Sequence, residues 1–348
     1  MVLDAPTLEK PPRRVLIIDT AWLGDVIFTT SLIGATRRAW PGSEIHVLVA
    51  TRGELLLKAH PQIDRLWVYD KGGRERRLGS LMRIAEHLRR TEFDMVLNAH
   101  PSFRSRLLTW LTRAPVRVGY HGFLSSLMFT HRVSNSLHVE PNHAARRVAL
   151  LRQLVPDADG VRLEVGVSDE TGASVSRELH DRGIAESPIL ALIPGSARNT
   201  KMWPTERFAE IAARWIAERE GHVLVFGAGR EQAVVEEIVG EAGGRAHGFV
   251  NRPLDLVAGL LSRCDCVVGN DTGVSFLAIA AGAKRVLVIY GCTQVNYHFP
   301  GPHRAVEAGV PCCLPRTGHG QSRCRWADRP WCMEQLGVDR VWEEIAGS

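Results

Sequence analysis

Short, fully apolar runs alternate with segments of helical periodicity along this 348-residue chain, and the alternation starts twice. In the first series the apolar runs are residues 15–18, 45–50, 65–69 and 94–98, and helices are expected at 25–39, 78–90 and 102–112. In the second series the runs are residues 189–193, 222–226, 266–269 and 285–290, and helices are expected near 205–219, 230–242, 253–263 and 273–281. Fully apolar strands separated by helices predict parallel sheets with helices on both faces. The sequence therefore predicts an α/β protein with two doubly wound domains.

The break between the two series falls on VPDADGVRLEVGVSDETG, residues 155–172, which is rich in Asp and Gly. We place a hinge there, with a first domain over residues 13–160 and a second over residues 172–335. A last helix is expected over residues 338–346. Ligands of doubly wound sheets bind where the carboxyl ends of the strands lead into helices. We therefore expect the two domains to face each other across a ligand-binding cleft.

The composition, 45% hydrophobic and 23% charged residues, is that of a soluble globular protein. No apolar run approaches the roughly 18 to 20 residues of a membrane-spanning helix, and residues 1–14 lack the apolar stretch of a secretory signal. All seven cysteines lie in the second half of the chain, and an odd number in this context predicts reduced thiols. We expect a cytoplasmic protein whose contact with a membrane, if it has one, is peripheral.

The net charge of +5 is divided unevenly along the chain. Residues 1–165 hold 24 Lys and Arg against 16 Asp and Glu, a balance of +8, and the remaining residues have a balance of −3. Arginine clusters at residues 71–77, 87–90 and 103–106 are candidates to face an anionic partner or lipid headgroups. The alternative for each cluster is a solvated helix face.

The loop after the first apolar run places Gly24 and Asp25 at the start of a helix. A carboxylate at this position can simply cap or complement the helix N-terminus. Gly24 beside it lets a ligand or another backbone come close, at a strand end that is expected to face the cleft. On these residues alone, both a structural and a functional role of Asp25 stay open.

The stretch IPGSARNTKMWPTERF, residues 193–208, directly follows an apolar run. Its Gly195 and Ser196 offer unhindered backbone N–H groups and a hydroxyl. Arg198 and Lys201 add positive charge before a helix that is expected to begin near residue 204. This arrangement suits a phosphate group, although the GxxxxGK[ST] pattern of a Walker loop is absent.

The stretch VVGNDTGVSFLAIAAG, residues 267–282, contains a tight turn between a strand and a helix, formed by Asn270, Asp271, Thr272 and Gly273. Backbone N–H groups at the start of that helix should point outward and form a second cradle for an anion. A turn made of good turn residues is the structural alternative. Two such cradles in one domain favour a phosphate-bearing ligand.

Three further patterns indicate other chemistry only weakly. FGAGREQ, residues 226–232, lacks the last Gly of GxGxxG, which argues against a nicotinamide cofactor. The run Asp157-Ala158-Asp159 has the DxD spacing of some metal sites, but a surface turn is the simpler interpretation. Four thiols near the C-terminus offer a possible structural zinc site without a CxxC pair, namely Cys312, Cys313, Cys324 and Cys332.

Taken together, these segments resemble glycosyltransferase family 9, the ADP-heptose:lipopolysaccharide heptosyltransferases. The resemblance covers about residues 13–346 and rests on four motifs, LIIDTAWLGDVIFTTSLI, ALIPGSARNTKMWPTERF, VLVFGAGREQ and VVGNDTGVSFLAIAAGAKRVLVIYGCT. It implies a GT-B architecture of two Rossmann-like domains facing a cleft, with the acceptor held mainly by the first and the nucleotide sugar by the second. It also implies an inverting reaction without a metal or other cofactor, and a C-terminal helix, residues 338–346, that packs back across the domains.

The resemblance implies a role for each matching residue. Asp25 corresponds to the acidic residue that serves as general base, and Lys201 to a catalytic lysine at the diphosphate. Ser196 corresponds to a hydroxyl at the same group, and Glu231 to a carboxylate that binds the nucleoside. The donor's diphosphate and sugar lie beside a D[ST]G turn that is matched here by Asp271, Thr272 and Gly273.

The implied function is the transfer of a heptose from ADP-heptose to a lipopolysaccharide inner-core acceptor. Its partners are the nucleotide sugar and a lipid-linked oligosaccharide at the cytoplasmic face of the inner membrane, with no nucleic acid, and the chain is expected to be a monomer. Gly24 and Arg104 are candidates for binding the acceptor. Phe276 stands where many members have His, and Gly291-Cys292-Thr293 replaces a GPT turn. The alternatives are a nucleotide-sugar epimerase on the same fold and a non-catalytic carbohydrate-binding relative.

Overall fold

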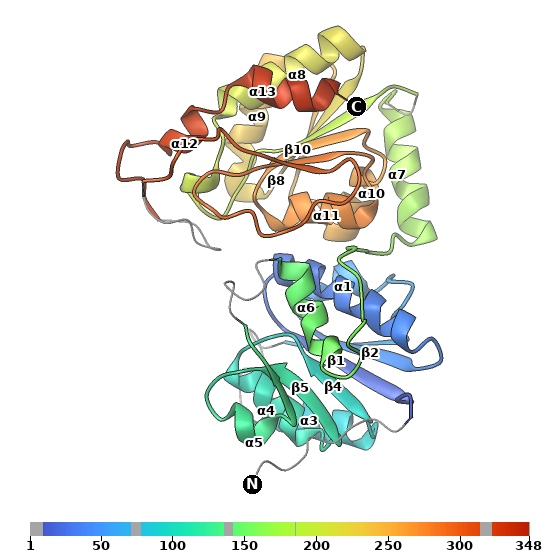
Figure 1. The fold of residues 1–348 in the computed structure, drawn as a ribbon. Coiled ribbons are helices and arrows are strands. Elements are labelled where there is room, and N and C mark those ends of the chain that lie inside the picture. Colours follow the sequence, from blue (N-terminus) through green and yellow to red (C-terminus); the bar gives the residue numbers. More distant parts are fainter. Residues whose placement is uncertain (1–9, 71–77, 136–141, 185, 314–321, 348) are drawn as a thin grey trace. The chain divides into compact units, whose positions relative to one another are not determined.

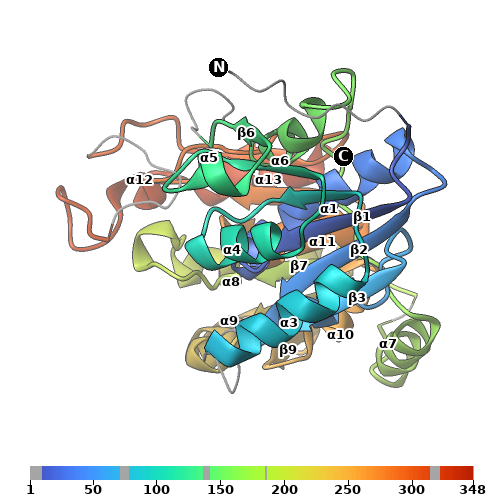
Figure 2. The same ribbon diagram turned by 90° about the horizontal axis from the view of Figure 1, so that it is seen from below.

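The computed structural model describes residues 10–70, 78–135, 142–184, 186–313 and 322–347. The chain divides into two compact units, unit 1 over Met1–Gly166 and unit 2 over Val167–Ser348. Each unit contains a six-stranded sheet in which all neighbouring strands run parallel. Helices cover both faces of each sheet (Figure 1, Figure 2). The prediction of two doubly wound α/β domains is therefore confirmed.

Unit 1 has the strand order β3-β2-β1-β4-β5-β6. Its elements, in chain order, are β1 (Arg14–Asp19), α1 (Leu23–Ala39), β2 (Glu44–Ala50), α2 (Thr51–Leu57), β3 (Arg65–Tyr69), α3 (Leu78–Arg90), β4 (Met95–Asn98), α4 (Phe103–Leu111), β5 (Val116–Tyr120), α5 (Ser125–Met128), β6 (His131–Val133) and α6 (His143–Arg152).

The helices of unit 1 lie in two layers. One face of the sheet packs against α3 and α4 through a buried cluster that includes Leu16, Val96, Leu88 and Leu108. The other face is covered by α1 and α6, which pack against each other and against the central strands. Apart from Arg14 at the start of β1, strands β1 and β4 are apolar up to their last residues, Asp19 and Asn98, which are both buried at the carboxyl edge. This edge of the sheet is where polar groups gather.

Unit 2 has the strand order β12-β11-β10-β7-β8-β9. Its elements are α7 (Asp169–Asp181), β7 (Ile189–Ile193), η2 (Asn199–Lys201), α8 (Thr205–Arg219), β8 (His222–Gly227), η3 (Gly229–Glu231), α9 (Gln232–Ala242), β9 (Ala246–Val250), α10 (Leu254–Leu261), β10 (Cys266–Asn270), α11 (Gly273–Ala281), β11 (Val286–Ile289), β12 (Arg304–Val306), α12 (Trp331–Glu334) and α13 (Val338–Ala346).

The larger core of unit 2 joins α8, α9, α12 and α13 to one face of the sheet. Trp203 is buried in it and donates an indole N–H bond to the Leu336 carbonyl (2.9 Å), so the C-terminal segment is fastened to the loop after β7. The last helix occurs where it was expected, over Val338–Ala346, and it packs against α8. Every helix in the described residues is too short or too polar to cross a bilayer.

The segment between the two series, where the hinge is expected, is not irregular throughout. The last four residues of segment 155–172 are helical, because α7 begins at Asp169. Ser168 caps this helix by accepting a bond from the Thr171 N–H (3.2 Å), and Asp169 and Glu170 complement its positive end. The end of this Asp- and Gly-rich segment is therefore the start of a helix.

Candidate functional site

Asp19, the last residue of β1, is fully buried and organises the loop that follows. Its carboxylate accepts bonds from the Ala21 N–H (2.9 Å) and from the Thr29 hydroxyl (2.5 Å). Burial raises the pKa of Asp19 to about 6; the nearby charge of Asp25 adds to this rise and Arg147 opposes it. Asp19 is thus a structural carboxylate beneath the loop.

Asp25 lies in the first turn of α1 and does not cap it, because Trp22 holds the N-cap position. Its carboxylate accepts a bond from Nη2 of Arg147 (2.8 Å), while 36% of the side chain stays exposed. Arg147, from α6, is only 3% exposed, and its Nε donates to the Thr29 hydroxyl (3.2 Å). A buried cation therefore holds an accessible carboxylate in place at the carboxyl edge of the sheet.

Arg147 was missed by the sequence analysis. Burial opposes the charge of its guanidinium, but Tyr120, Asp19 and Asp25 together raise its pKa, so it stays cationic. Its only sequence signal is an arginine pair, Arg146-Arg147, inside a helix that was not predicted.

The two predicted acceptor residues lie at the same edge of the unit 1 sheet. Gly24 is half-buried in the first turn of α1, and Arg104 is exposed in the first turn of α4. The loops after β1 and β4 meet through Thr20 Oγ1 and Nδ1 of His100 (2.9 Å). His100 is a further polar group at this edge that sequence reasoning had not singled out.

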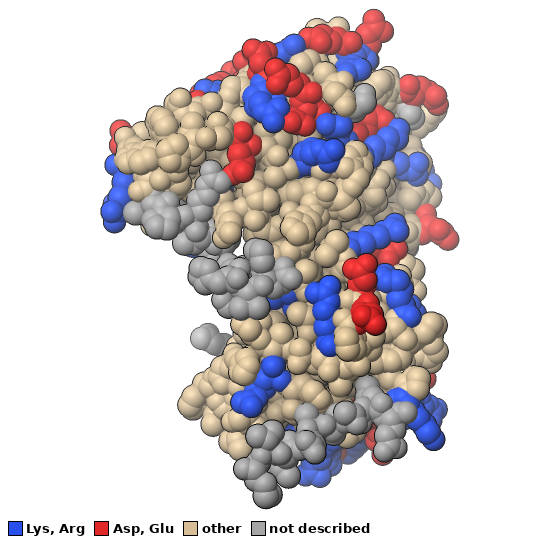
Figure 3. Space-filling view, viewed as in Figure 1, with Lys and Arg blue, Asp and Glu red and all other residues tan. Residues whose placement is uncertain are grey.

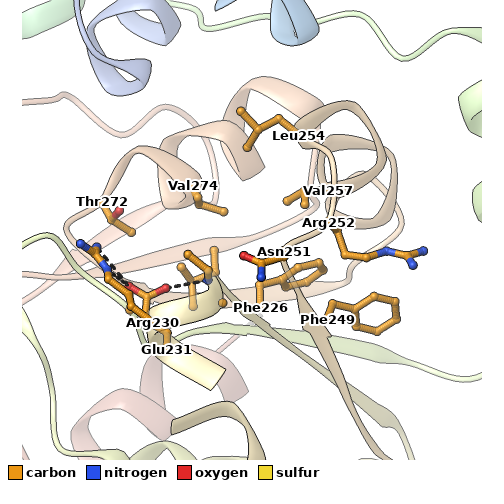
Figure 4. Close-up of a pocket in the computed structure, with 14 residues that line it drawn as sticks. Phe226, Arg230, Glu231, Phe249, Asn251, Arg252, Leu254, Val257, Thr272 and Val274 are labelled. Carbon is orange, nitrogen blue, oxygen red and sulfur yellow. Dashed lines mark hydrogen bonds and ion pairs between the residues drawn. The ribbon is translucent and has the colours of Figure 1, made fainter. Parts of the chain in front are cut away.

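Unit 2 contains a cavity of about 360 Å³, within the size range of small-ligand sites. Figure 4 shows Glu231, Arg230 and Thr272 on one side of it and Phe249 and Arg252 on the other. The whole lining comprises Ile193, Gly195, Phe226, Gly227, Ala228, Arg230, Glu231, Phe249, Asn251, Arg252, Leu254, Val257, Thr272 and Val274. Of these, Glu231, Thr272 and Gly195 were singled out from the sequence, whereas the aromatic and aliphatic walls were not.

Glu231 is held tightly at this cavity. Its carboxylate accepts a bond from the Ala228 N–H (2.8 Å) and pairs with Nη2 of Arg230 (3.3 Å). Gly195 allows this position, because a Cβ at residue 195 would lie 2.3 to 2.4 Å from the Glu231 carboxyl atoms. The glycine of the predicted phosphate turn thus makes room for a carboxylate.

The two predicted anion cradles are joined by Asn270 at the end of β10. Its side chain donates to the Pro194 carbonyl (2.6 Å) and accepts from the Trp203 N–H (3.0 Å). Across the same junction, Nζ of Lys201 pairs with Asp271 (2.7 Å), and both side chains are largely buried. The structure therefore brings the loop after β7 and the turn after β10 together.

Thr272 is the N-cap residue of α11, and Gly273 is its first residue. The hydroxyl of Thr272 makes no capping bond, and the residue lines the cavity. Ser196 is buried in the other cradle, the loop after β7, and its carbonyl accepts a bond from Nη2 of Arg230 (3.2 Å). The cavity thus has a carboxylate, a hydroxyl and a helix N-terminus at one end, and apolar walls elsewhere.

Phe276 is a core residue. It is 3% exposed and packs edge-on against Tyr297 (ring centroids 5.9 Å apart) and parallel to Phe299 (6.3 Å). The side chain at this position therefore fills an aromatic cluster behind α11 and does not line the cavity.

The four C-terminal cysteines line one small pocket, with the Cys313 and Cys324 sulfur atoms 3.8 Å apart. They are free thiols. Among the residues that the structure describes, no three His, Cys, Asp or Glu side chains are arranged to hold a metal ion. The DxD run is a turn whose Asp159 carbonyl accepts a bond from Arg38 (2.6 Å), and the arginine cluster 71–77 lies outside the described residues.

Comparisons with known proteins place this geometry in a family. Residues 81–313 match the sequence profile of glycosyltransferase family 9 (heptosyltransferase). Lipooligosaccharide heptosyltransferase 2 of Haemophilus influenzae is 25% identical over 304 residues, which cover 82% of this chain and 86% of that protein. A family 9 glycosyl transferase from Veillonella parvula has a TM-score of 0.82 at 22% identity, with 96% of each chain covered.

The ADP-heptose lps heptosyltransferase II of E. coli has a TM-score of 0.76 at 20% identity, and the match covers 96% of this chain and 98% of that one. These likenesses confirm the predicted GT-B class of two Rossmann-like domains. The family profile spans most of the chain and includes both cradles and the cavity of unit 2. The chain is a glycosyltransferase and belongs to glycosyltransferase family 9 (heptosyltransferase).

Proposed function

We propose that this enzyme transfers a heptose from ADP-heptose to a lipopolysaccharide inner-core acceptor, by an inverting, metal-independent displacement with Asp25 as general base. Family membership supports glycosyl transfer, and the activities for which the relatives are named support the heptose, the ADP carrier and the lipooligosaccharide acceptor. We further propose that the chain acts as a monomer at the cytoplasmic face of the inner membrane.

The cavity of unit 2 is the proposed donor site. Its apolar walls suit a nucleobase, and the Glu231 carboxylate can accept bonds from ribose hydroxyls. The diphosphate is assigned to the adjoining cradles, where Ser196, Thr272 and the N-terminus of α11 offer donors. Lys201 supplies a cation that Asp271 holds in position. These groups would stabilise the charge that builds on the departing diphosphate, the task that a metal performs in other transferases.

Asp25 is the proposed base because a substrate can reach its carboxylate, whereas Asp19, the other carboxylate after β1, is fully buried. In the displacement, an acceptor hydroxyl oxygen forms a bond to the anomeric carbon, and the bond from that carbon to the diphosphate oxygen breaks. The hydroxyl proton passes to Asp25, and ADP leaves with the electron pair. A single displacement from the opposite face inverts the anomeric carbon.

The contact that carries this assignment is the bond between Arg147 and Asp25. Arg147 occupies one carboxylate oxygen and fixes its direction, which leaves the other oxygen for the acceptor hydroxyl. We assign Arg147 as a positioning residue, because its own side chain is buried and does not reach solvent.

Replacement of Asp25 by Asn tests the proposal. Turnover should fall by at least about 10² to 10⁴-fold, while ADP still raises the melting temperature of the variant. The matched control is Glu54→Gln, which removes an exposed carboxylate from the first turn of α2 in the same unit. Full turnover by Asp25→Asn would exclude Asp25 as the base.

A donor-only assay separates the two alternative functions. An epimerase would convert the nucleotide sugar without an acceptor, whereas the proposed transferase leaves most donor intact until an acceptor is added. A non-catalytic relative would bind nucleotide and yield no product. A thermal-shift panel of ADP, UDP, GDP and their sugars identifies the base that the cavity prefers.

A further inference from the structure

Unit 1 exposes a group of large apolar side chains on three neighbouring helices. Figures 1 and 2 both show α4 lying between α3 and α5, and α4 packs against each of them. We call the exposed apolar residues of these helices and of the loop before α5 the α3–α5 surface: Met82, Phe103, Trp110, Phe123, Leu124 and Leu127. Phe123 is 75% exposed and Leu127 is 67% exposed. Among the described residues of unit 2, Trp326 is the only exposed large apolar side chain, at 52%.

Specific contacts fix the conformation of the loop that carries Phe123 and Leu124. Leu124 adopts a left-handed backbone conformation (φ 57°), which is costly for a leucine and persists only where the surroundings enforce it. Arg106, buried in α4, donates to the Phe123 carbonyl (3.1 Å) and to the Pro101 carbonyl (2.7 Å). Gly122 lets the guanidinium approach, because a Cβ there would lie 2.2 Å from Nη2. Phe123 is therefore presented outward by a fastened loop.

The charge around α4 and α5 has one sign, whereas α3 also carries Glu86, which pairs with Arg89 and Arg90. Between Asp94 and Glu140 the sequence contains five arginines and no Asp or Glu. Arg104, Arg113 and Arg132 of this stretch are exposed. In the face shown in Figure 3, the part of unit 1 over α4 and α5 is tan and blue without red. A solvated helix face would carry both signs, so this composition calls for a partner that is anionic and apolar at once.

We propose that the α3–α5 surface docks this enzyme on an anionic lipid bilayer. Phe123, Leu124 and Leu127 would enter the boundary between headgroups and acyl chains, and Trp110 would lie at headgroup depth. The exposed arginines would contact lipid phosphates, each contributing about 1 kcal/mol near an anionic surface. A bilayer supplies both the negative charge and the apolar layer that these side chains require.

The placement of this surface gives it a use in the proposed reaction. Phe103 and Phe123 follow the carboxyl ends of β4 and β5, the edge of the parallel sheet at which β1 leads to Asp25. Docking would therefore turn the edge that carries Asp25 toward an acceptor whose lipid is anchored in the same membrane. This last step rests on the proposed function, whereas the docking itself does not.

Vesicle flotation with the full chain tests the docking. The enzyme should float with vesicles of phosphatidylcholine and phosphatidylglycerol at low salt, and much less with phosphatidylcholine alone or at high salt. The double variant Phe123→Ser/Leu127→Ser should lower the partition coefficient at least about tenfold, and Arg113→Ser about fivefold. Matched controls are Leu55→Ser on α2 and Arg177→Ser on α7, which remove exposed residues outside the surface.

The melting temperature of each variant shows whether it is folded. The Arg113→Ser variant tests the same surface while its apolar residues remain in place. Three results would each overturn the proposal: no flotation of the parent enzyme, equal flotation with neutral vesicles, or wild-type flotation of both variants. An enzyme that does not float at all would point to an acidic protein partner instead. Turnover on a delipidated acceptor should be unchanged in the Phe123→Ser/Leu127→Ser variant. If the parent enzyme docks on the vesicles but transfers no heptose, that result would count against the proposed function and not against the docking.

Discussion

The two sheets have the same strand order. When the strands of each unit are numbered from its own first strand, β1 or β7, both orders are 3-2-1-4-5-6. The loop after the first strand differs in charge between them. In unit 1 it leads to a carboxylate, Asp25, which is held by a cation from α6. In unit 2 it supplies a cation, Lys201, which is held by a carboxylate at the end of β10. One topology thus places a carboxylate at this position in one unit and a cation in the other, which are the proposed proton acceptor and phosphate partner.

The two ion pairs also differ in depth. Arg147 is almost fully buried and contacts Asp25, Asp19 and Thr29, whereas Lys201 keeps 14% of its side chain exposed and has Asp271 as its ion-pair partner. Removal of Arg147 leaves two carboxylates without their cation, one of them the fully buried Asp19, whereas removal of Lys201 leaves only Asp271 unpaired. The comparison predicts that the same kind of substitution damages the stability of unit 1 and the ligand binding of unit 2.

The largest expected effect is that of Arg147→Met. It leaves Asp19 buried without its cation, so we expect a loss of about 3–5 kcal/mol in the free energy of unfolding. The matched substitution Lys201→Met should cost less stability and instead weaken ADP binding. Denaturant titration and thermal shifts with ADP measure both quantities.

A double variant shows where the cost of Arg147→Met arises. Adding Asp19→Asn removes the buried charge and should recover a large part of the lost stability, without restoring turnover, because Asp25 is still unheld. Arg147→Lys, which keeps the charge without the fork geometry, should lower kcat and leave ADP affinity intact. If Arg147→Met and Lys201→Met lose the same free energy of unfolding, the ion pair of unit 1 is no more important for stability than that of unit 2, contrary to this prediction.

The second prediction concerns pH and is specific to unit 1. Burial raises the pKa of Asp19 from 3.8 to about 6, so the folded state binds this proton more tightly than the unfolded state. The stability that this provides is present in full below about pH 4 and is lost as pH rises through about 6, about 3 kcal/mol in total. Asp19→Asn should flatten the measured unfolding free energy over that window.

Asp64 provides a control of opposite sign. Burial opposes its ionisation, but bonds from the Ile45 N–H and from Arg37 outweigh burial and lower its pKa. Its stabilising effect is therefore present above its unfolded pKa and is lost as pH falls, and Asp64→Asn should remove that loss. A steeper pH dependence in Asp19→Asn than in the parent chain would refute the assignment of the proton to Asp19.

The third prediction addresses the cavity of unit 2. In Gly195→Ala the new Cβ displaces the Glu231 carboxylate, which can move, so stability should change little. The proposed donor site, however, loses a placed hydrogen-bond acceptor, and ADP affinity should fall about tenfold to a hundredfold. Calorimetric titration with ADP measures the change.

Gly240 gives the matched control in the same unit. It lies in α9 with open space around its position, so Gly240→Ala should raise stability by up to about 1 kcal/mol and leave ADP affinity unchanged. If Gly195→Ala binds ADP as tightly as the parent chain, Glu231 does not contribute to the proposed donor site.

The sequence predicted those parts of the molecule whose pattern is local and strong. Strands such as Ile189–Ile193 and helices such as Thr205–Arg219 were recognised because their apolar residues follow one period without interruption. The strand Val116–Tyr120 was missed because it is short and contains Arg117 and Gly119. Helix α6 was missed because His143 and two adjacent arginines hide its apolar face.

The candidate site was predicted only where a residue type and a turn coincide. Asp25, Lys201 and the turn after β10 carry such signals in neighbouring positions. The bond between Asp25 and Arg147 joins residues that are 122 positions apart, and no local pattern encodes a contact of that separation. The same holds for the cavity walls, where Phe226 and Phe249 stack at 5.5 Å only because β8 and β9 pair in register.

The smallest predicted effect lies at the start of unit 2. The Ser168 hydroxyl accepts a bond from the Thr171 N–H and donates to the Thr171 hydroxyl (2.9 Å), so Ser168→Ala should cost about 1 kcal/mol. Ser174→Ala, at an exposed position within α7, should be neutral or slightly stabilising, because alanine has the higher helix propensity. If unit 2 unfolds separately from unit 1, only its transition should shift; a shift of the unit 1 transition instead would show that α7 stabilises both sheets.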